Sequence, residues 1–175
     1  MTSLAPADGS LLLACDGSCL KNPGGATGWA WVAEDGRWAS GYQPSGTNQV
    51  AELWGVLSVL RDFANEPVIV QIDSEYAMNI ATKWAKGWAR KGWVTAGGKP
   101  VSNLGLVKSI YSQMLVREAP IRFQKVPGHD PGNRWPLNTA ADERARAAAV
   151  FARQNGTSGT REGHDAALEA TLRFA

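Results

Sequence analysis

Short apolar runs separated by turn residues dominate the first part of the chain. Residues 11–15 form such a run and end at Asp16-Gly17, a pair typical of turns, which predicts a buried strand. Residues 29–32 and 37–42 have the composition of two more strands, and residues 34–36, Glu-Asp-Gly, are typical of a hairpin turn. The pattern therefore predicts three consecutive antiparallel strands.

Further along, apolar residues recur at helical spacing. Val50, Leu53, Leu57 and Leu60 fall on one helix face, which predicts a helix over about residues 48–63. The later segments follow in the order strand 68–72, helix 75–85, irregular 86–103, helix 104–117, strand 121–126, loop 127–136 and helix 140–153. This order predicts an α/β (mixed α+β) fold, in which a five-stranded mixed sheet is flanked by helices.

The composition changes towards the C-terminus. Residues 155–163 are rich in Gly, Ser and Thr, which predicts a flexible linker, and residues 165–174 have the pattern of one more short helix. We therefore expect an N-terminal extension over residues 1–9, one domain over 10–154 and a flexible C-terminal tail over 155–175.

Charge and cysteine content narrow the class of protein only a little. The net charge is +2 and 44% of the residues are hydrophobic, so we expect a folded core, but the total charge does not predict a nucleic-acid partner. Cys15 and Cys19 follow no secretory pattern, so free thiols in a cytoplasmic protein are expected. No apolar run is long enough for a membrane span, and a monomer is the default expectation.

Four acidic residues stand at the ends of predicted elements: Asp16 and Asp73 after strands, and Glu52 and Asp142 early in helices. Taken singly, an Asp before Gly favours a turn, and a Glu early in a helix favours the helix dipole. If the two strands are neighbours, however, the carboxylates gather at one corner, where their repulsion disfavours the charged forms unless divalent cations bind. Carboxylate oxygens suit Mg²⁺ or Mn²⁺, not zinc.

The local contexts of these acids occur in a fixed order: Asp16-Gly17-Ser18-Cys19, Asn22-Pro23-Gly24, Thr47-Asn48-Gln49 before Glu52, Asp73-Ser74, Gly128-His129, and Asn138 with Ala141-Asp142. On this set, residues 10–150 closely resemble ribonuclease HI. The resemblance implies a ribonuclease H-like fold. It also implies a metal-dependent endonuclease, a hydrolase that cuts the RNA strand of RNA–DNA hybrids and leaves 5′-phosphate and 3′-hydroxyl ends.

The resemblance also implies roles for five of these residues. The four acids Asp16, Glu52, Asp73 and Asp142 would hold two Mg²⁺ ions, or Mn²⁺ in their place, roughly 3.5–4 Å apart. His129 would assist proton transfer or product release, although a His in a Gly/Pro loop is more often a surface residue. The stretch from His129 to Asp142 is longer than in the common bacterial form, so His129 is placed less firmly than the acids.

A basic segment without any acidic residue lies between Glu75 and Glu118. It carries Lys83, Lys86, Arg90, Lys91, Lys99, Lys108 and Arg117, with Trp84, Trp88 and Trp93 interleaved. Such a segment is typical either of a solvated helix face with tryptophans in the core or of a groove for a nucleic-acid backbone. It resembles the basic protrusion of the ribonuclease HI family.

Three sets of substrate-binding residues follow from the same resemblance. Tyr76, Trp84 and Trp88 match the channel for the DNA strand, Thr47 and Asn103 match the DNA phosphate pocket, and Asn22, Asn48 and Gln49 match the residues that read the minor groove. The chain departs from the family pattern at Ser45, where some members have Arg, and at Ala96, where others have a hydroxylated residue. We therefore expect weaker binding of the DNA strand.

Two other functions remain open from the sequence. One is a different metal-dependent nuclease on the same type of fold, such as an exonuclease or a resolvase-like enzyme, because fold alone does not separate these activities. The other is a non-catalytic module that binds hybrids. The Asp-Gly-Ser opening with Asn-Pro-Gly disfavours the first, and the presence of all four acids disfavours the second.

Overall fold

The computed structural model describes residues 9–173, and the side chain of residue 173 is not part of that description. The expected N-terminal extension over residues 1–9 therefore lies almost wholly outside the described residues, as do the last two residues of the expected tail. Within the described part, no helix combines the length and the apolar character needed to cross a membrane.

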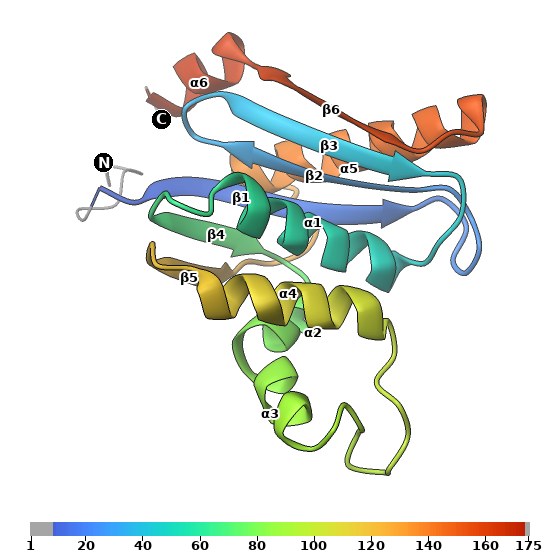
Figure 1. The fold of residues 1–175 in the computed structure, drawn as a ribbon. Helices are drawn as coiled ribbons and strands as arrows, with labels where there is room; N and C mark the ends of the chain where they lie inside the picture. The colour runs from blue at the N-terminus through green and yellow to red at the C-terminus, as the bar shows by residue number, and fades with distance from the viewer. Residues whose placement is uncertain (1–8, 174–175) are drawn as a thin grey trace.

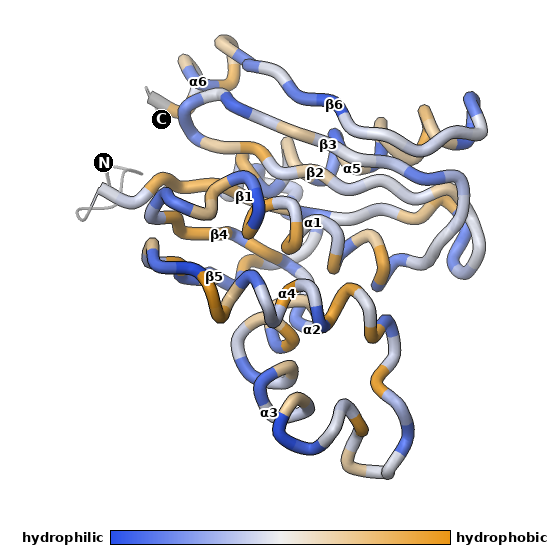
Figure 2. Tube along the Cα trace, in the orientation of Figure 1, coloured by the Kyte–Doolittle hydropathy of each residue, from blue (hydrophilic) through white to orange (hydrophobic). Residues whose placement is uncertain are grey.

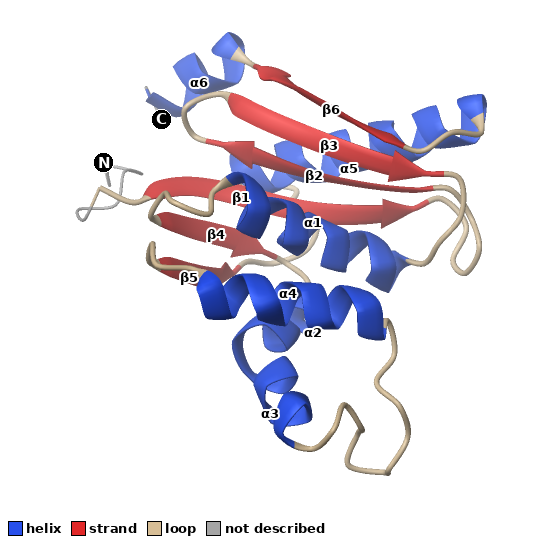
Figure 3. Ribbon diagram, in the orientation of Figure 1, coloured by secondary structure: helices blue, strands red, loops and turns tan. Residues whose placement is uncertain are grey.

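A single mixed sheet forms the centre of the molecule (Figures 1 and 3). Its strands are β1 (Leu11–Cys19), β2 (Thr27–Ala33), β3 (Arg37–Gln43), β4 (Val68–Ile72), β5 (Ile121–Lys125) and β6 (Gly159–His164), in the spatial order β5-β4-β1-β2-β3-β6. The strands from β1 through β2 and β3 to β6 pair antiparallel, whereas β4 pairs parallel with both β1 and β5. The predicted ribonuclease H-like mixed sheet flanked by helices is confirmed.

Helices cover both faces of this sheet (Figure 1). They are α1 (Asn48–Asp62), α2 (Glu75–Asn79), the π-helical turn η1 (Ile80–Trp84), α3 (Ala85–Arg90), α4 (Leu104–Val116), α5 (Pro136–Asn155) and α6 (Ala166–Arg173). α1 and α4 lie on one face, α5 lies on the other, and α3 with the loop after it projects away from the sheet. The continuous stretch from α2 to α3 is longer than the helix predicted over residues 75–85.

Two apolar clusters hold these layers together, and Figure 2 shows the hydrophobic segments along the sheet. The larger cluster joins β1, β2 and β4 to α1 and α4, with Leu53, Leu57 and Ile110 fully buried. The smaller cluster lies on the opposite face and includes Leu137 of α5 and Leu172 of α6. Burial of these side chains is the main favourable term in folding.

The first strand is longer than its apolar run predicts. Asp16 and Gly17 were expected to form a turn, but they lie inside β1, where Asp16 pairs with Ala30 and Gly17 with Trp29 of β2. Backbone hydrogen bonds to the neighbouring strand outweigh the local turn preference of an Asp-Gly pair. Asp16 therefore sits on a rigid strand within the sheet.

The prediction of a flexible linker over residues 155–163, and with it of a five-stranded sheet, is wrong. Residues 159–164 form a sixth strand, β6, which pairs antiparallel with β3, and α6 follows it. A Cβ at Gly163 would lie 2.8 Å from Cζ2 of Trp38, so the missing side chain lets that ring lie against the strand. Glycine here indicates close packing, although in sequence it is equally typical of linkers.

Candidate active site

The strand order brings two of the predicted acids together. Ala14 of β1 pairs in parallel with Gln71 of β4, so Asp16 lies two residues further along β1, and Asp73 lies two residues further on, directly after β4. Asp16 Oδ1 accepts a hydrogen bond from the backbone N–H of Gly17, with an N–O distance of 2.7 Å. The expectation that these strands are neighbours, on which the acidic cluster depended, is correct.

Close packing of α1 against β1 brings Glu52 to the same corner. A Cβ on Gly17 would lie 2.3 Å from the backbone nitrogen of Glu52, so only glycine permits this approach. Glu52 Oε2 accepts a hydrogen bond of 2.7 Å from Ser74 Oγ, and its Oε1 accepts one of 3.4 Å from Asn48 Nδ2. Thus Glu52 is held from two directions.

The fourth acid comes from the opposite face of the sheet. Asp142 lies in the second turn of α5, is exposed, and shares a hydrogen bond with the side chain of Asp16. One turn earlier, the buried Asn138 donates a hydrogen bond to Asp73. We call the group of Asp16, Glu52, Asp73 and Asp142 the acidic corner.

Burial and mutual repulsion raise the pKa values of Asp16, Glu52 and Asp73. Burial, together with the neighbouring Asp73 and Asp142 carboxylates, raises the pKa of Asp16 from 3.8 to about 8. Burial also raises the pKa of Glu52 and of Asp73, and the hydrogen bonds from Ser74 and Asn138 oppose this rise. Desolvation and like charges both disfavour the ionised forms, and the two effects combine at this corner.

The donor chemistry of the acidic corner fits a hard divalent cation. All four donors are carboxylates, and crowded carboxylates with raised pKa values are the arrangement whose repulsion a cation relieves. In addition, Asn138 Oδ1 is buried and finds no hydrogen-bond partner among residues 9–173. Over the same residues, no three His, Cys, Asp or Glu side chains already stand in a ready-made metal geometry. Binding of a cation therefore requires these side chains to change position.

Three residues that support the acids were not assigned this role from the sequence. Ser74 Oγ donates to Glu52 and at the same time accepts from Ala77 N at 3.2 Å, which caps α2. Asn138 orients Asp73, and Lys125, at the end of β5, lowers the pKa of the same carboxylate through its charge. Ser74 and Asn138 stood in the sequence motifs, but only the fold shows which acid each one contacts.

His129 lies on the loop between β5 and α5. Its side chain is exposed, and its backbone φ of 52° lies in the left-handed region. The preceding Gly128 is close to the acids, since a Cβ built on it would lie 3.4 Å from Asp73 Oδ2. An ion pair between Asp130 and Arg134 closes the loop further on, at 3.2 Å. The loop therefore runs past the acidic corner, while its histidine faces solvent.

The residues predicted to read the minor groove gather at the start of α1. Asn22 Oδ1 accepts a hydrogen bond of 3.1 Å from the backbone N–H of Asn48, and Asn48 in turn contacts Glu52. Gln49 is exposed beside them. Thr47 has a structural role as well, because its hydroxyl caps α1 by accepting from Val50 N at 3.1 Å.

The predicted aromatic residues form a continuous surface, which we call the aromatic ridge. It consists of Tyr76, Trp84 and Trp88, with ring centroids 6.3 Å apart for the first pair and 5.9 Å for the second. Trp84 is 40% exposed, which is unusual for a large apolar side chain. Asn103 Nδ2 donates to the Tyr76 hydroxyl at 3.3 Å, so Asn103 lies beside the ridge.

The basic segment divides into two parts. Lys83, Lys86, Arg90 and Lys91 are exposed on η1, α3 and the turn that follows, next to the aromatic ridge. Arg117 is different, because it donates to the carbonyl oxygens of Phe63 and Glu66 at 2.7 and 2.5 Å and so ties α4 to the end of α1. Trp93 packs edge-on against Tyr111. Trp88 and Trp93 are both partly buried against the larger apolar cluster, whereas Trp84 is exposed, so the core interpretation holds for two of the three tryptophans.

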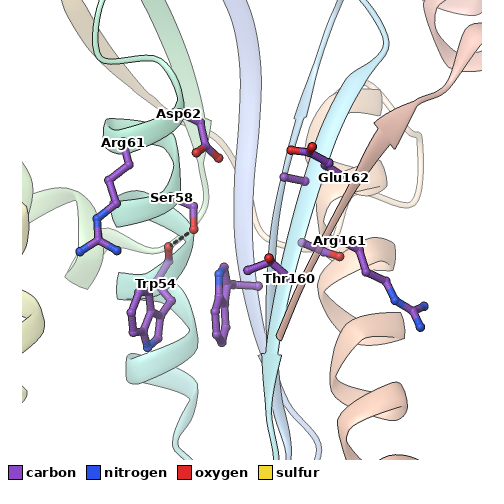
Figure 4. A pocket seen from close by; sticks show the side chains of 10 residues that line it. Trp54, Ser58, Arg61, Asp62, Thr160, Arg161 and Glu162 are labelled. Carbon is purple, nitrogen blue, oxygen red and sulfur yellow. Dashed lines mark hydrogen bonds between the residues drawn. The ribbon is translucent and has the colours of Figure 1, made fainter. Parts of the chain in front are cut away.

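A separate cavity of about 450 Å³ lies between α1 and β6 (Figure 4). Its lining includes Trp29 and Trp54, which stack with centroids 5.1 Å apart, and the hydroxyls of Ser58 and Thr160. None of the four acids lines it, and its charged residues are of both signs. The acidic corner therefore remains the candidate site.

Comparison with known proteins agrees with this geometry. A sequence model of the RNase H family matches residues 8–150. Ribonuclease HI of Streptomyces coelicolor is 41% identical over 152 residues, which cover 83% of this chain but only 64% of that protein. Ribonuclease H of Tropheryma whipplei (strain Twist) is 40% identical over 141 residues, covering 79% of this chain and 84% of its own.

Solved structures share the fold at lower sequence identity. LC9-RNase H1, described as a type 1 RNase H with the type 2 active-site motif, aligns with a TM-score of 0.68 and 22% identity over 94% of this chain and 85% of its own. A foamy viral protease-reverse transcriptase in complex with an RNA/DNA hybrid aligns with a TM-score of 0.65 and 20% identity over 81% of this chain and 20% of its own. On the family match and the two bacterial relatives, the chain belongs to the ribonuclease H family.

Proposed function

We propose that the protein is an endonuclease that hydrolyses the RNA strand of RNA–DNA hybrids. The observation that supports this most strongly is the acidic corner, where four carboxylates from β1, α1, α5 and the residue after β4 crowd together. It lies beside the amides at the start of α1. A nuclease needs both a charged centre and a surface for the nucleic-acid backbone.

Asp16, Glu52, Asp73 and Asp142 are the residues that would hold two Mg²⁺ ions, with Mn²⁺ as an alternative. When bound, such ions activate water and neutralise the charge that develops on the phosphate and the leaving oxygen. The protein's own part is to orient the carboxylates: Ser74 holds Glu52 and Asn138 holds Asp73, while the charge of Lys125 favours the ionised form of Asp73. His129, on its exposed loop, would accept or deliver a proton as products leave. Cleavage would leave 5′-phosphate and 3′-hydroxyl ends.

The two strands of the hybrid would be recognised by different surfaces. Asn22, Asn48 and Gln49 carry both donors and acceptors, as contacts to a 2′-hydroxyl require, and Asn48 already touches Glu52. The aromatic ridge with Asn103, together with Lys83 of η1, Lys86 of α3 and Lys91 of the turn that follows, would take the DNA strand, by stacking and by phosphate contacts. Thr47, whose hydroxyl already caps α1, would contribute to the phosphate pocket only secondarily.

A cleavage assay on a labelled hybrid with both ends blocked tests this proposal. We expect internal cuts in the RNA strand with Mg²⁺, none with EDTA, and none in duplex RNA or duplex DNA of the same sequence. Cleavage confined to unblocked ends would indicate an exonuclease. Binding of the hybrid without any cutting, in either Mg²⁺ or Mn²⁺, would overturn the proposal in favour of a binding module.

The variant Asp73→Asn tests the metal site itself. It removes one negative charge while keeping the shape of the side chain, so we expect cleavage to fall to background while the hybrid still binds in a gel-shift assay. Glu143→Gln is the matched control, because Glu143 is exposed on α5 next to Asp142. We expect this variant to cleave the hybrid normally. Normal cleavage by Asp73→Asn would show that the metal-site assignment is wrong.

A further inference from the structure

The C-terminal residues 159–173, which we call the C-terminal arm, contact the part of α5 that carries site residues. The arm consists of β6 and α6 and lies beyond residue 150, where the match to the family model ends. β6 fixes one end of the arm by pairing with β3. α6 then turns back towards the first half of α5 (Figure 1).

An ion pair joins the arm to α5 close to the acidic corner. Arg144 Nη2 donates to Asp165 Oδ2 at 2.7 Å, and the two side chains are only 27% and 32% exposed. Arg144 is held further by the Trp38 ring, 4.2 Å from its guanidinium carbon, and Asp165 caps α6 by accepting from Leu168 N at 3.0 Å. Each partner is thus fixed by a second contact, which reduces the entropic cost of the pair.

Apolar contacts extend the same junction. Leu172 of α6 is 7% exposed and packs in one cluster with Leu137 and Ala141 of α5. Leu172 also lines a small cavity of about 40 Å³ together with Trp135 and Pro136, where the His129 loop enters α5. The arm therefore packs against the start of α5, and the end of the His129 loop borders the same cavity.

The contacted half of α5 also carries Asn138 and Asp142. Asn138 orients Asp73, and Asp142 reaches Asp16 although it is exposed, so both depend on the position of the helix. We propose that the C-terminal arm holds the first half of α5 in place for the acidic corner, with Arg144 and Asp165 as positioning residues. This inference rests on the proposed function, since the acids must act together for their position to matter.

The chain offers a matched control at the other end of α5. There the arm contacts the helix through Arg161, whose guanidinium carbon lies 3.7 Å from the centroid of the Phe151 ring. Phe151 lies more than two turns beyond Asp142, so this contact stabilises the arm without holding the site. Arg161→Ala and Asp165→Asn each remove one polar contact of the same arm. Asn retains the helix cap that Asp165 provides.

Hydrogen–deuterium exchange on the free protein tests the positioning directly. We expect Asp165→Asn to speed exchange in residues 136–145 and to leave residues 148–155 nearly unchanged. We expect Arg161→Ala to speed exchange in residues 148–155 and to leave residues 136–145 nearly unchanged. This readout needs neither metal nor substrate, so it stands even if hybrid cleavage fails. Equal exchange in residues 136–145 of Asp165→Asn and the parent protein would overturn the proposal.

Mg²⁺ dependence then connects position to the site. In a titration followed by thermal shift without nucleic acid, we expect Asp165→Asn to need about three- to tenfold more Mg²⁺ than the parent, with the same change in half-maximal cleavage. Arg161→Ala should keep the parental Mg²⁺ dependence. Arg144→Lys retains the charge that pairs with Asp165, so its Mg²⁺ requirement should stay close to that of the parent protein. An equal increase in the Mg²⁺ requirement of Asp165→Asn and Arg161→Ala would show that the arm only stabilises the fold in general, and it would overturn the proposal.

Discussion

Asp16 is a carboxylate placed where the fold alone would not favour one. It lies inside a sheet strand, and burial with neighbouring acids raises its pKa to about 8. Residues with strongly shifted pKa values of this kind cluster at functional sites, because function requires charges that stability opposes. The stability that the protein loses by keeping this functional carboxylate can be measured by replacing Asp16.

Asp16→Asn is expected to stabilise the metal-free protein. Because the folded-state pKa of about 8 lies above the ordinary value of 3.8, ionisation costs stability progressively as pH rises between these values. In EDTA at pH 8 we expect the Tm of the variant to exceed that of the parent by about 2–6 °C, with a smaller difference at pH 5. A lower Tm at pH 8 would show that Asp16 is stabilised by contacts other than these.

His129→Ala tests a residue that the structure leaves exposed. If His129 assists proton transfer, its loss should slow cleavage about 10²–10⁴-fold without changing hybrid affinity. Glu143→Gln, exposed on α5, serves again as the control and is expected to leave cleavage unchanged. Unchanged turnover in His129→Ala would remove this residue from the proposed mechanism.

At the scale of elements, the site depends on how closely helices approach the sheet. α1 contacts β1 at Gly17, and the second turn of this helix supplies Glu52. Protein interiors are packed densely, so a single added methyl group has to displace backbone here. The residue that permits the approach therefore matters as much as the acid itself.

Gly17→Ala is expected to impair both stability and cleavage. The new Cβ would lie 2.3 Å from backbone atoms of Ala51 and Glu52, so α1 has to move away from β1. We expect a Tm lower by about 5–10 °C and a loss of cleavage greater than unfolding explains. Gly87→Ala is the control: it lies in α3 with nothing within 4 Å of a built Cβ and should raise the Tm slightly.

At the scale of the whole molecule, the acidic corner and the aromatic ridge are joined by α2. Ser74 at the start of α2 holds Glu52, and Tyr76 in its first turn begins the ridge. A hybrid bound across both surfaces would have its RNA strand near the acids and its DNA strand on the ridge. The length of α2 would then set the spacing between the DNA-binding surface and the position at which the RNA strand is cut.

Trp88→Ala tests this division of labour. Loss of one stacking ring should weaken hybrid binding about tenfold, seen as a higher KM with kcat nearly unchanged. Leu115→Ala is the control, since this side chain is 65% exposed on α4 and should leave both parameters unchanged. A fall in kcat with an unchanged KM would place Trp88 near the chemistry instead of on a binding surface.

The sequence by itself determined the order of the main elements up to α5, and the resemblance of its local motifs to ribonuclease HI selected the four acids as candidates. Apolar periodicity and local motifs are encoded in residues close together in the chain, and they need no knowledge of distant partners. The helix over residues 48–62 and the strand over residues 68–72 appear nearly where the pattern places them. The segments next to the acids were recognisable for the same reason.

Only the tertiary structure decided how these pieces meet. The extension of β1 past Asp16, the strand β6, and the contacts of Ser74, Asn138 and Arg117 all depend on partners far away in the chain. Gly163 shows the reason, because a glycine typical of a linker is also the residue that lets the Trp38 ring lie against a strand. Local preference is weak beside the free energy of burial and backbone pairing, which is settled only when the whole sheet forms.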